Sequence, residues 1–482
     1  MKGYLTNDTI AACGTALNGP VAMIRVSGPK TREIIATVTQ GRVGSDRSKG
    51  LVARHAYFSV LGSSRKLDEG VLVYFESPNS FTGEDVVEFF IHGGAFNVER
   101  VLKDVLAAGA RLAQPGEFSF RAVRNAKMDL NQAIAVAELI AAEGDMAADL
   151  AIEKLDGSLT RAVRALSDAI KSLVAMGEVA IDFSDQDVEE LSLRELKKRG
   201  QAVFKDLQYL ASSFERGKRL IEGVSIAFLG LPNAGKSSLF NALLGEDLSI
   251  VSDLAGTTRD VVRERIRLRG SQGTFTAKLF DTAGLKVDSK VQSTSKTSHD
   301  EIEREGIRRS RKAGKEADLI LFLVDAVSAT ASSSELDQAL FELEEARAQR
   351  NDVVLPIISR SDLVTTESLN ELSFRLNSIT NLLWVSCSVN SKEDLEKVTE
   401  ELSRRCEALV SRTPREVVLT RLEQLDAVNA AITHLKRALD STEFDLFAAD
   451  VRHTLVSLAP LIGQTPTEEI LGRIFSEFCI GK

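Results

Sequence analysis

A glycine-rich loop near the middle of the chain has the residue types that bind the phosphates of a nucleotide. Gly230-Leu-Pro-Asn-Ala-Gly-Lys-Ser237, called the phosphate loop below, fits the spacing G-x-x-x-x-G-K-[ST]. Apolar runs at 224–229 and 239–244 predict a buried strand before it and a helix after it. In that context backbone N–H groups and the helix N-terminus cradle phosphates, so we expect Lys236 to reach the β- and γ-phosphates and Ser237 to ligate Mg²⁺. The residues expected to contact the nucleotide here are Asn233, Ala234, Gly235, Lys236, Ser237 and Ser238.

Two later motifs supply further parts of a GTPase. Gly256-Thr-Thr-Arg-Asp260 contains Thr258, whose hydroxyl can close on Mg²⁺ when a γ-phosphate is bound. Asp281-Thr-Ala-Gly284 follows a predicted strand, with Asp281 suited to hold the metal through water and the Gly284 N–H suited to sense the γ-phosphate. The expected nucleotide contacts from this part are Ser252, Asp253, Leu254, Ala255, Gly256, Thr257, Thr258, Asp281, Thr282, Ala283 and Gly284.

The position that follows the second motif is Leu285. Small signalling GTPases place a glutamine there to orient the attacking water. Hydrolysis by this chain must therefore take its water-positioning group and its positive charge from elsewhere.

The motif expected to recognise the base is imperfect. Where Asn-Lys-x-Asp is usual, this chain has Ser359-Arg-Ser-Asp362. Asp362 can accept hydrogen bonds from the N1–H and N2–H₂ donors of guanine, which excludes adenine, and Arg360 can stack over the base. Ser359 lacks the amide that would tie the loops together, so we expect GTP, bound less tightly than usual. An ordinary loop aspartate is the alternative for Asp362. The expected base contacts are Ser359, Arg360, Ser361, Asp362, Ser386, Cys387 and Ser388.

Length and composition place these motifs in a multidomain protein. The chain has 482 residues, too many for one core, and its 44% hydrophobic and 27% charged residues are ordinary for a soluble protein. No apolar stretch approaches the roughly 18 residues of a membrane helix, and the first residues resemble neither a secretory signal nor an organelle presequence. Four cysteines without metal-like spacing indicate a reducing, cytoplasmic location. With a net charge of −9, a nucleic-acid partner would have to be held by local basic patches.

The elements around the phosphate loop change along the chain. Apolar runs predict strands at 21–26, 70–75 and 86–91 and a helix near 97–108, which indicate an α+β domain. From about 122 to 217 the pattern is typical of a bundle of long helices. Its predicted helical stretches are 129–183, with Asp129 as N-cap, and 192–214.

From residue 224 the pattern alternates between strands and helices, which predicts a mostly parallel sheet. The predicted strands are 275–281, 319–325, 353–358 and 382–386. After Pro414 the chain is helical again, so we expect the nucleotide domain to be inserted into a helical domain whose two halves pair. The expected domains are 1–121, 122–217, 218–412 and 413–482.

Two segments have unusual composition. Residues 286–299 are rich in Ser, Thr and Lys and are expected to form a mobile loop. The basic run at 263–269 alternates charged and apolar residues, which favours the exposed face of an edge strand over an RNA-binding patch.

Together these motifs resemble the MnmE (TrmE) family of tRNA-modifying GTPases, and the resemblance extends over essentially the whole chain. It is carried by Pro232-Asn-Ala-Gly-Lys-Ser-Ser238, Gly256-Thr-Thr-Arg-Asp260, Asp281-Thr-Ala-Gly-Leu285, Asn79-Ser-Phe-Thr-Gly-Glu-Asp85, His92-Gly-Gly94, Pro115-Gly-Glu-Phe118 and Phe478-Cys-Ile-Gly-Lys482. The resemblance implies an N-terminal folate-binding and dimerising α+β domain, a discontinuous helical domain and an inserted Ras-like GTPase domain.

The resemblance also implies GTP hydrolysis assisted by K⁺. Asn233 matches the family's K⁺ ligand, and backbone oxygens near Ser252, Leu254 and Thr257 would complete the cation site. Glu303 matches the glutamate that positions the attacking water, and a solvated helix charge is the alternative for it.

A one-carbon folate, such as 5,10-methylenetetrahydrofolate, is the second implied ligand. Arg25, Glu88, Lys127 and Lys482 match the folate-contacting positions, and Cys479 resembles a functional thiol whose role stays open. The resemblance also implies a homodimer that works with a flavin partner, MnmG, which carries FAD and uses NADH. Together the two proteins of the family add an aminomethyl or carboxymethylaminomethyl group to carbon 5 of the wobble uridine of certain tRNAs.

Two other functions fit part of the pattern. A GTP-dependent switch for ribosome or RNA assembly would use the same GTPase motifs, but it needs neither the folate-matching residues nor the Cys-Ile-Gly-Lys tail. A scaffold with a degenerate nucleotide site would explain the change at Ser359 and Arg360, but Lys236, Ser237, Thr258 and Asp281 are intact.

Overall fold

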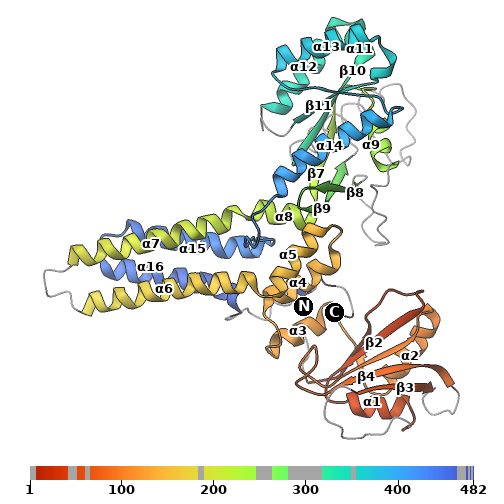
Figure 1. The fold of residues 1–482 in the computed structure, drawn as a ribbon. Coiled ribbons are helices and arrows are strands. Elements are labelled where there is room, and N and C mark those ends of the chain that lie inside the picture. Colours follow the sequence, from red (N-terminus) through yellow and green to blue (C-terminus); the bar gives the residue numbers. More distant parts are fainter. Residues whose placement is uncertain are drawn as a thin grey trace, which may run out of the picture. The chain divides into compact units, whose positions relative to one another are not determined.

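The computed structural model describes residues 7–41, 52–59, 66–182, 189–245, 263–280, 317–348, 354–463, 474–475, 478 and 481. These residues form two compact units (Figure 1). One unit comprises Met1–Ala137, Lys154–Leu207 and Asp426–Lys482, and the other comprises Glu138–Glu153 and Gln208–Leu425. Each unit is therefore assembled from segments that are distant in the sequence.

The first unit contains a six-stranded sheet in the order β3-β4-β5-β2-β1-β6. Its strands are β1 (Ile10–Cys13), β2 (Val21–Ser27), β3 (Val52–Ser59), β4 (Lys66–Phe75), β5 (Val86–His92) and β6 (Arg111–Leu112). Alternate residues such as Ile24 and Phe89 share an apolar core with α1 (Thr31–Val38) and α2 (Ala95–Ala107). Because strand side chains alternate between faces, Arg25 and Glu88 lie on the opposite face of this sheet. The α+β prediction is confirmed.

Helices make up the rest of the first unit. They are α3 (Glu117–Arg124), α4 (Leu130–Ala141), α6 (Ser158–Asp182), α7 (Glu189–Ser212), α15 (Leu422–Asp440), α16 (Phe444–Leu458) and the 3₁₀ turn η2 (Ala459–Ile462). Helix α6 packs against α16, and Gly200 of α7 packs against Leu435 and Leu439 of α15 (Figure 1). Helices from both sides of the nucleotide domain thus pair, as predicted.

The helical stretch predicted at 129–183 is three helices, α4, α5 (Asp145–Leu155) and α6. Asp129 caps α4 as expected, since its Oδ1 accepts from the Gln132 N–H at 2.9 Å while the Gln132 Oε1 accepts from the Asp129 N–H at 2.9 Å. Gly157, at φ +82°, adopts the left-handed conformation before α6, which ends one helix and starts the next.

The end of the chain returns to the N-terminal part of the first unit. Phe475 and Phe478 share an apolar cluster with Phe120 and Ile134, and the Phe120 and Phe475 rings meet edge to face at 5.9 Å between centroids. A Cβ on Gly481 would lie 2.4 Å from the Cys13 carbonyl oxygen, so the tail passes β1 at backbone contact.

The second unit is built around a sheet in the order β12-β11-β10-β7-β9-β8. Its strands are β7 (Val224–Leu229), β8 (Arg263–Gly270), β9 (Gly273–Phe280), β10 (Leu319–Asp325), β11 (Val354–Ser359) and β12 (Val385–Cys387). All neighbours pair in parallel except β8, which joins β9 antiparallel at one edge. This sheet confirms the predicted nucleotide-domain architecture.

Helices cover both faces of this sheet. Alternate residues of β10 point to opposite faces, and each set belongs to a separate apolar core that includes helices. One core includes α8 (Phe214–Glu222), α9 (Lys236–Gly245) and α14 (Lys392–Val410). The other includes α11 (Ala326–Ala331), α12 (Ser333–Arg347) and α13 (Thr366–Thr380).

The basic run at 263–269 forms the edge strand β8, as favoured from the sequence. Two of its side chains bind the loop before α5: Arg265 Nη1 lies 2.6 Å from Glu143 Oε1, and Arg267 Nε donates to the Glu143 carbonyl at 2.9 Å. Asp145 at the start of α5 accepts from the Thr274 N–H of β9 at 3.1 Å. The arginines therefore have a structural role in joining helix α5 to the sheet.

Across the described part of the chain, the helices are too short or too polar to cross a membrane.

Candidate functional site

The phosphate loop connects β7 to α9, as its sequence predicts. Gly230 has φ +134°, and a Cβ there would lie 2.2 Å from the Leu323 carbonyl oxygen of β10, so only glycine fits this crossing. Helix α9 begins at Lys236, which places its N-terminal N–H groups at the loop. The Lys236 ammonium donates to the carbonyl oxygens of Gly230 and Leu231, each at 2.8 Å. The positive charge of Lys236 is thus held within the loop.

The residues expected to contact the base, 359–362 and 386–388, are together called the base loop. Ser359 ties the base loop to the phosphate loop, although the sequence predicted that this tie would be lost with the usual asparagine. Its hydroxyl lies at the end of β11 and is hydrogen-bonded to the carbonyl oxygens of Ala234 at 2.7 Å and Val324 at 3.2 Å. Because N–H and C=O point in opposite directions in a trans peptide, the bond to Ala234 leaves the Gly235 N–H facing away from Ser359. The hydroxyl therefore replaces the amide as a brace for the loop.

Arg360 forms a second tie to the same loop. Its Nη2 donates to the Asn233 carbonyl oxygen at 2.7 Å, and its Nη1 lies 3.5 Å from Asp325 Oδ2. Both Arg360 (φ 53°) and Asn233 (φ 63°) are left-handed, an uncommon conformation outside glycine. The sequence predicted stacking of Arg360 over the base, whereas the structure directs its guanidinium to the phosphate loop.

Asp362 lies in the 3₁₀ turn η1 (Ser361–Leu363), exposed at the same edge of the sheet. A hydrogen bond with the Ser388 side chain, followed by one from Asn390, lowers the pKa of Asp362. The Asn390 Nδ2 donates to Asp362 Oδ2 at 3.1 Å. The carboxylate is therefore ionised and oriented by neutral donors. Sequence reasoning missed Asn390, whose one signal is its place two residues after Ser388.

The remaining base-loop residues have different surroundings. Cys387 is buried in the apolar core behind β12, and this burial raises the pKa of its thiol to about 12. Ser386 precedes it on the same strand, and Ser388 follows with its N–H donating to Asp394 Oδ2 at 3.0 Å. Cys387 thus shapes the loop through packing.

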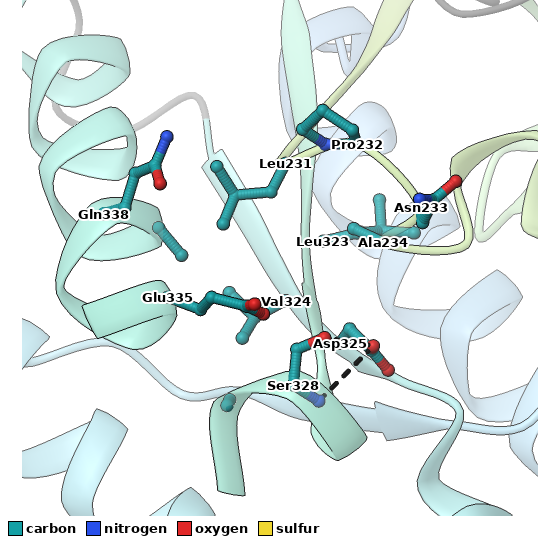
Figure 2. Close-up of a pocket in the computed structure, with 12 residues that line it drawn as sticks. Leu231, Pro232, Asn233, Ala234, Leu323, Val324, Asp325, Ser328, Glu335 and Gln338 are labelled. Carbon is teal, nitrogen blue, oxygen red and sulfur yellow. Dashed lines mark hydrogen bonds between the residues drawn. The ribbon is translucent and has the colours of Figure 1, made fainter. Parts of the chain in front are cut away.

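A cavity of about 330 Å³ adjoins the phosphate loop (Figure 2). The loop forms one wall, the end of β10 forms the floor, and α11 and α12 form the opposite wall with Ser328 and Glu335. Figure 2 shows Asp325 at the strand end, hydrogen-bonded to Ser328, with Asn233 on the loop above it. Asp325 is a second residue that sequence reasoning did not single out.

Several predicted site residues lie outside the part of the chain that the structure describes. They are Ser252, Asp253, Leu254, Ala255, Gly256, Thr257, Thr258, Asp281, Thr282, Ala283, Gly284, Glu303, Cys479 and Lys482, together with the loop 286–299.

The predicted folate residues Arg25 and Glu88 meet across the β2–β5 pair of the first unit. Arg25 Nε and Nη2 lie 2.9 and 2.8 Å from Glu88 Oε1, and no hydrogen bond from another described residue ends on Oε2. The Arg25 guanidinium lies over the rings of Phe81 and Phe118, 5.1 and 5.6 Å from their centroids. Each of the two charges is oriented and half-buried.

Lys127 is linked to the same region through the loop after β4. Its Nζ donates to the Pro78 carbonyl oxygen at 2.9 Å, three residues before Phe81. A Cβ on Gly83 would lie 3.2 Å from the Lys127 Cγ, so the side chain also packs on this loop.

Comparison with known protein families covers both units. The family model described as "GTP-binding protein TrmE N-terminus" matches residues 9–127, and the "MnmE helical domain" model matches residues 130–479. The chain belongs to the MnmE family of tRNA modification GTPases. The chain is 32% identical to "tRNA modification GTPase MnmE" of Clostridioides difficile strain 630, over 99% of each chain.

Two further MnmE relatives also match this chain over nearly its whole length. The protein of Aquifex aeolicus strain VF5 is 33% identical over 96% of each chain, and that of Desulfitobacterium hafniense strain Y51 is 34% identical over 99% of this chain and all of the relative. Among solved structures, the FeoB G-domain from Methanococcus jannaschii covers 38% of this chain and 98% of its own, with 26% identity and a TM-score of 0.25. That TM-score is too low to bear on the fold.

Proposed function

We propose that this MnmE-family chain hydrolyses GTP and acts in tRNA modification. The observation that carries the GTPase part is the braced phosphate loop: Lys236 lies inside it at the start of α9, and Ser359 and Arg360 bind its outer carbonyls. These contacts hold the backbone of the loop in place, so that its N–H groups are already positioned for phosphate charge when the nucleotide binds. The relatives are tRNA modification GTPases by name, which supports tRNA as the substrate class.

The loop residues account for nucleotide binding in this proposal. Backbone N–H groups of the phosphate loop and the N-terminus of α9 bind the phosphates, and Lys236 moves from the loop carbonyls to the β- and γ-phosphates. Asp362 accepts the two guanine donors. Ser237 lies in the first turn of α9, and its hydroxyl suits a Mg²⁺ ligand, with Thr258 as its proposed companion. Mg²⁺ would neutralise charge on the phosphates.

We further propose that hydrolysis depends on K⁺, with Asn233 as a ligand, backbone oxygens at Ser252, Leu254 and Thr257 completing the site, and Glu303 positioning water. The left-handed Asn233, whose carbonyl is held by Arg360, supports this assignment, because a fixed backbone presents its side chain in one direction. We expect turnover to be faster in KCl than in NaCl at equal ionic strength, and Asn233→Ala to remove the difference while retaining GTP binding. Equal rates in the two salts would contradict the K⁺ proposal.

The modification itself is proposed to use a one-carbon folate and a flavin partner. Glu88, whose Oε1 is fixed by Arg25, fits the paired donors of a pterin ring, and Lys127 and Lys482 fit the carboxylates of the folate's glutamate tail. The folate would supply the carbon of the new group at C5 of the wobble uridine. A homodimer working with an MnmG-like protein that carries FAD and uses NADH is the proposed assembly. Buried free thiols at Cys387 and Cys406 suit a reducing, cytoplasmic setting, and the role of Cys479 stays open.

Nucleoside mass spectrometry of tRNA tests the tRNA part of the proposal. A strain that lacks this protein should lose the modified wobble uridines and regain them with the wild-type gene, but not with Lys236→Ala. Wobble-uridine modification that is the same in all strains would favour a GTP switch in RNA assembly. Co-purification of the wild-type chain with its flavin partner, with light scattering for the mass of the complex, tests the assembly.

A further inference from the structure

We propose that Asp325 is a positioning residue of the phosphate loop: its carboxylate holds the Arg360 guanidinium on the Asn233 carbonyl. This inference rests on the proposed GTP-binding function. It assigns a role to a strand-end residue that lies outside the phosphate-loop and base-loop motifs.

Asp325 is placed for this role by two elements at once. It ends β10 with 8% of its surface exposed and pairs in register with Ser359, the residue before Arg360. Its side chain caps α11 by accepting from the N–H groups of Val327 and Ser328 and from the Ser328 hydroxyl, the last at 2.8 Å. The cap fixes the carboxylate against a buried strand, so the position that it offers Arg360 is fixed as well.

The contact between Arg360 and Asn233 completes a chain of fixed groups. Arg360 Nη1 lies 3.5 Å from Asp325 Oδ2 while Nη2 reaches the Asn233 carbonyl at 2.7 Å. The N–H of the same peptide, on Ala234, donates to the Leu231 carbonyl at 3.2 Å. This peptide is therefore held at both ends, and the orientation of the loop between Pro232 and Gly235 depends on the guanidinium.

Arginine suits this bridge better than the lysine that usually occupies the position. Its planar fork presents two N–H groups in fixed directions, so one can meet a carboxylate while the other meets a carbonyl. A lysine would offer a single point charge. The pairing of Arg360 with Asp325 thus explains how the chain braces its loop without the usual Asn-Lys pair.

The test is the isosteric variant Asp325→Asn. Asparagine is as good an N-cap as aspartate, so α11 should persist while the charge that orients Arg360 is removed. We expect affinity for GTP and for GDP to fall by a similar factor, about two- to fivefold, because both place phosphates in the loop. The ratio of GTP to ATP affinity should stay unchanged, since Asp362 recognises the base. Unchanged GTP and GDP affinity, or a changed GTP-to-ATP ratio, would overturn the inference.

A double-mutant cycle shows whether the effect passes through Arg360. In a protein that already carries Arg360→Met, the further change Asp325→Asn should not lower the affinity for GDP again. Independent, additive losses would mean that Asp325 acts by another route, and the proposal would be wrong.

The chain offers a matched control in the same unit. Arg405 on α14 also bridges a backbone carbonyl and a carboxylate: Nη1 donates to the Val354 carbonyl at 2.6 Å, and Nε lies 2.7 Å from Glu401 Oε1. This bridge lies at the start of β11, whereas Arg360 follows its end. Glu401→Gln should leave nucleotide affinity unchanged, and an equal loss in Glu401→Gln would reduce the Asp325 effect to general destabilisation. Failure of the wild-type chain to bind GTP would instead refute the proposed function.

Discussion

Asp362 and Glu88 are two carboxylates for which the same task is proposed, the recognition of a ring that carries two adjacent donors. Asp362 is exposed and is oriented by neutral groups, the Ser388 side chain and the Asn390 amide. Glu88 is half-buried on a sheet and is oriented by the Arg25 guanidinium, which itself lies on two aromatic rings.

The two supports lead to different consequences for ligand recognition and for the stability of the fold. Neutral donors orient Asp362 without neutralising it, so its charge is directed to the ligand and little of the fold depends on it. Glu88 is also the counterion of Arg25, so its loss leaves a guanidinium unpaired in a partly buried place. We therefore expect the Asp362 region to tolerate substitution at the cost of specificity, and the Glu88 region to lose ligand binding and stability together.

Replacement of Asp362 should have the largest effect on binding. Asp362→Asn should weaken GTP by about 100-fold, because two charge-assisted hydrogen bonds are replaced by one neutral bond and one donor facing a donor. Xanthosine triphosphate should become the preferred nucleotide, since the new amide can face its oxygen. Fluorescence titrations with both nucleotides measure the change, and urea unfolding should show a stability close to that of wild type, because Asp362 is exposed. A variant that still prefers GTP would contradict the role of Asp362.

Replacement of Glu88 should affect the other ligand. Glu88→Ala should reduce affinity for 5-formyltetrahydrofolate by at least about tenfold, because the pterin donors lose their charged acceptor. Calorimetry on the full-length protein measures the binding, and GTP hydrolysis by the same variant should stay near normal. If the wild-type protein shows no heat with the folate, or the variant binds it unchanged, Glu88 is a structural residue only.

A pair of variants compares the two supports directly. Arg25→Met leaves Glu88 without its counterion and should lower the free energy of unfolding by about 1–3 kcal/mol. Asn390→Ala removes a neutral donor from exposed Asp362 and should change it by no more than about 0.5 kcal/mol. Urea denaturation of the two variants under one condition gives both numbers. An equal decrease in the free energy of unfolding of the two variants would show that the charged and the neutral partner contribute equally to the stability of the protein.

Asp318 is a third carboxylate, and it accepts hydrogen bonds from both a neutral residue, Ser225, and a charged one, Arg219. Burial opposes its ionisation, but hydrogen bonds from Ser225 and Arg219 outweigh burial and lower the pKa of Asp318 below its usual 3.8. The stability that it contributes is present above pH 3.8 and is lost as pH falls through the lower folded-state pKa. Asp318→Asn should therefore cost about 1 kcal/mol at pH 7, and the difference from wild type should shrink below pH 3.8. A difference that does not change with pH would contradict this assignment.

Much of this molecule could be predicted from local sequence. The phosphate loop, the strand before it, the helix after it and the cap at Asp129 depend on residues within a few positions of one another, and each was found where expected. The helical stretch 129–183 was predicted without its two breaks, because the periodicity continues across Gly144 and Gly157 while the backbone turns there. The basic run of β8 was placed correctly at an edge, but its partner, Glu143, is more than a hundred residues away.

The sequence by itself determined the chemistry of the candidate site, because the spacing of Gly230, Gly235, Lys236 and Ser237 requires one local backbone shape. Tertiary structure alone decided how that loop is braced. Ser359 lacks the amide of the asparagine that is usual at this position, yet its hydroxyl reaches the Ala234 carbonyl because β11 ends beside the loop. Asp325 was invisible as a functional residue, since nothing local to β10 marks it, and it gains its role only when parallel pairing sets it opposite Ser359 and within reach of Arg360. Hydrogen bonds between distant segments depend on strand register, and register is a property of the whole sheet.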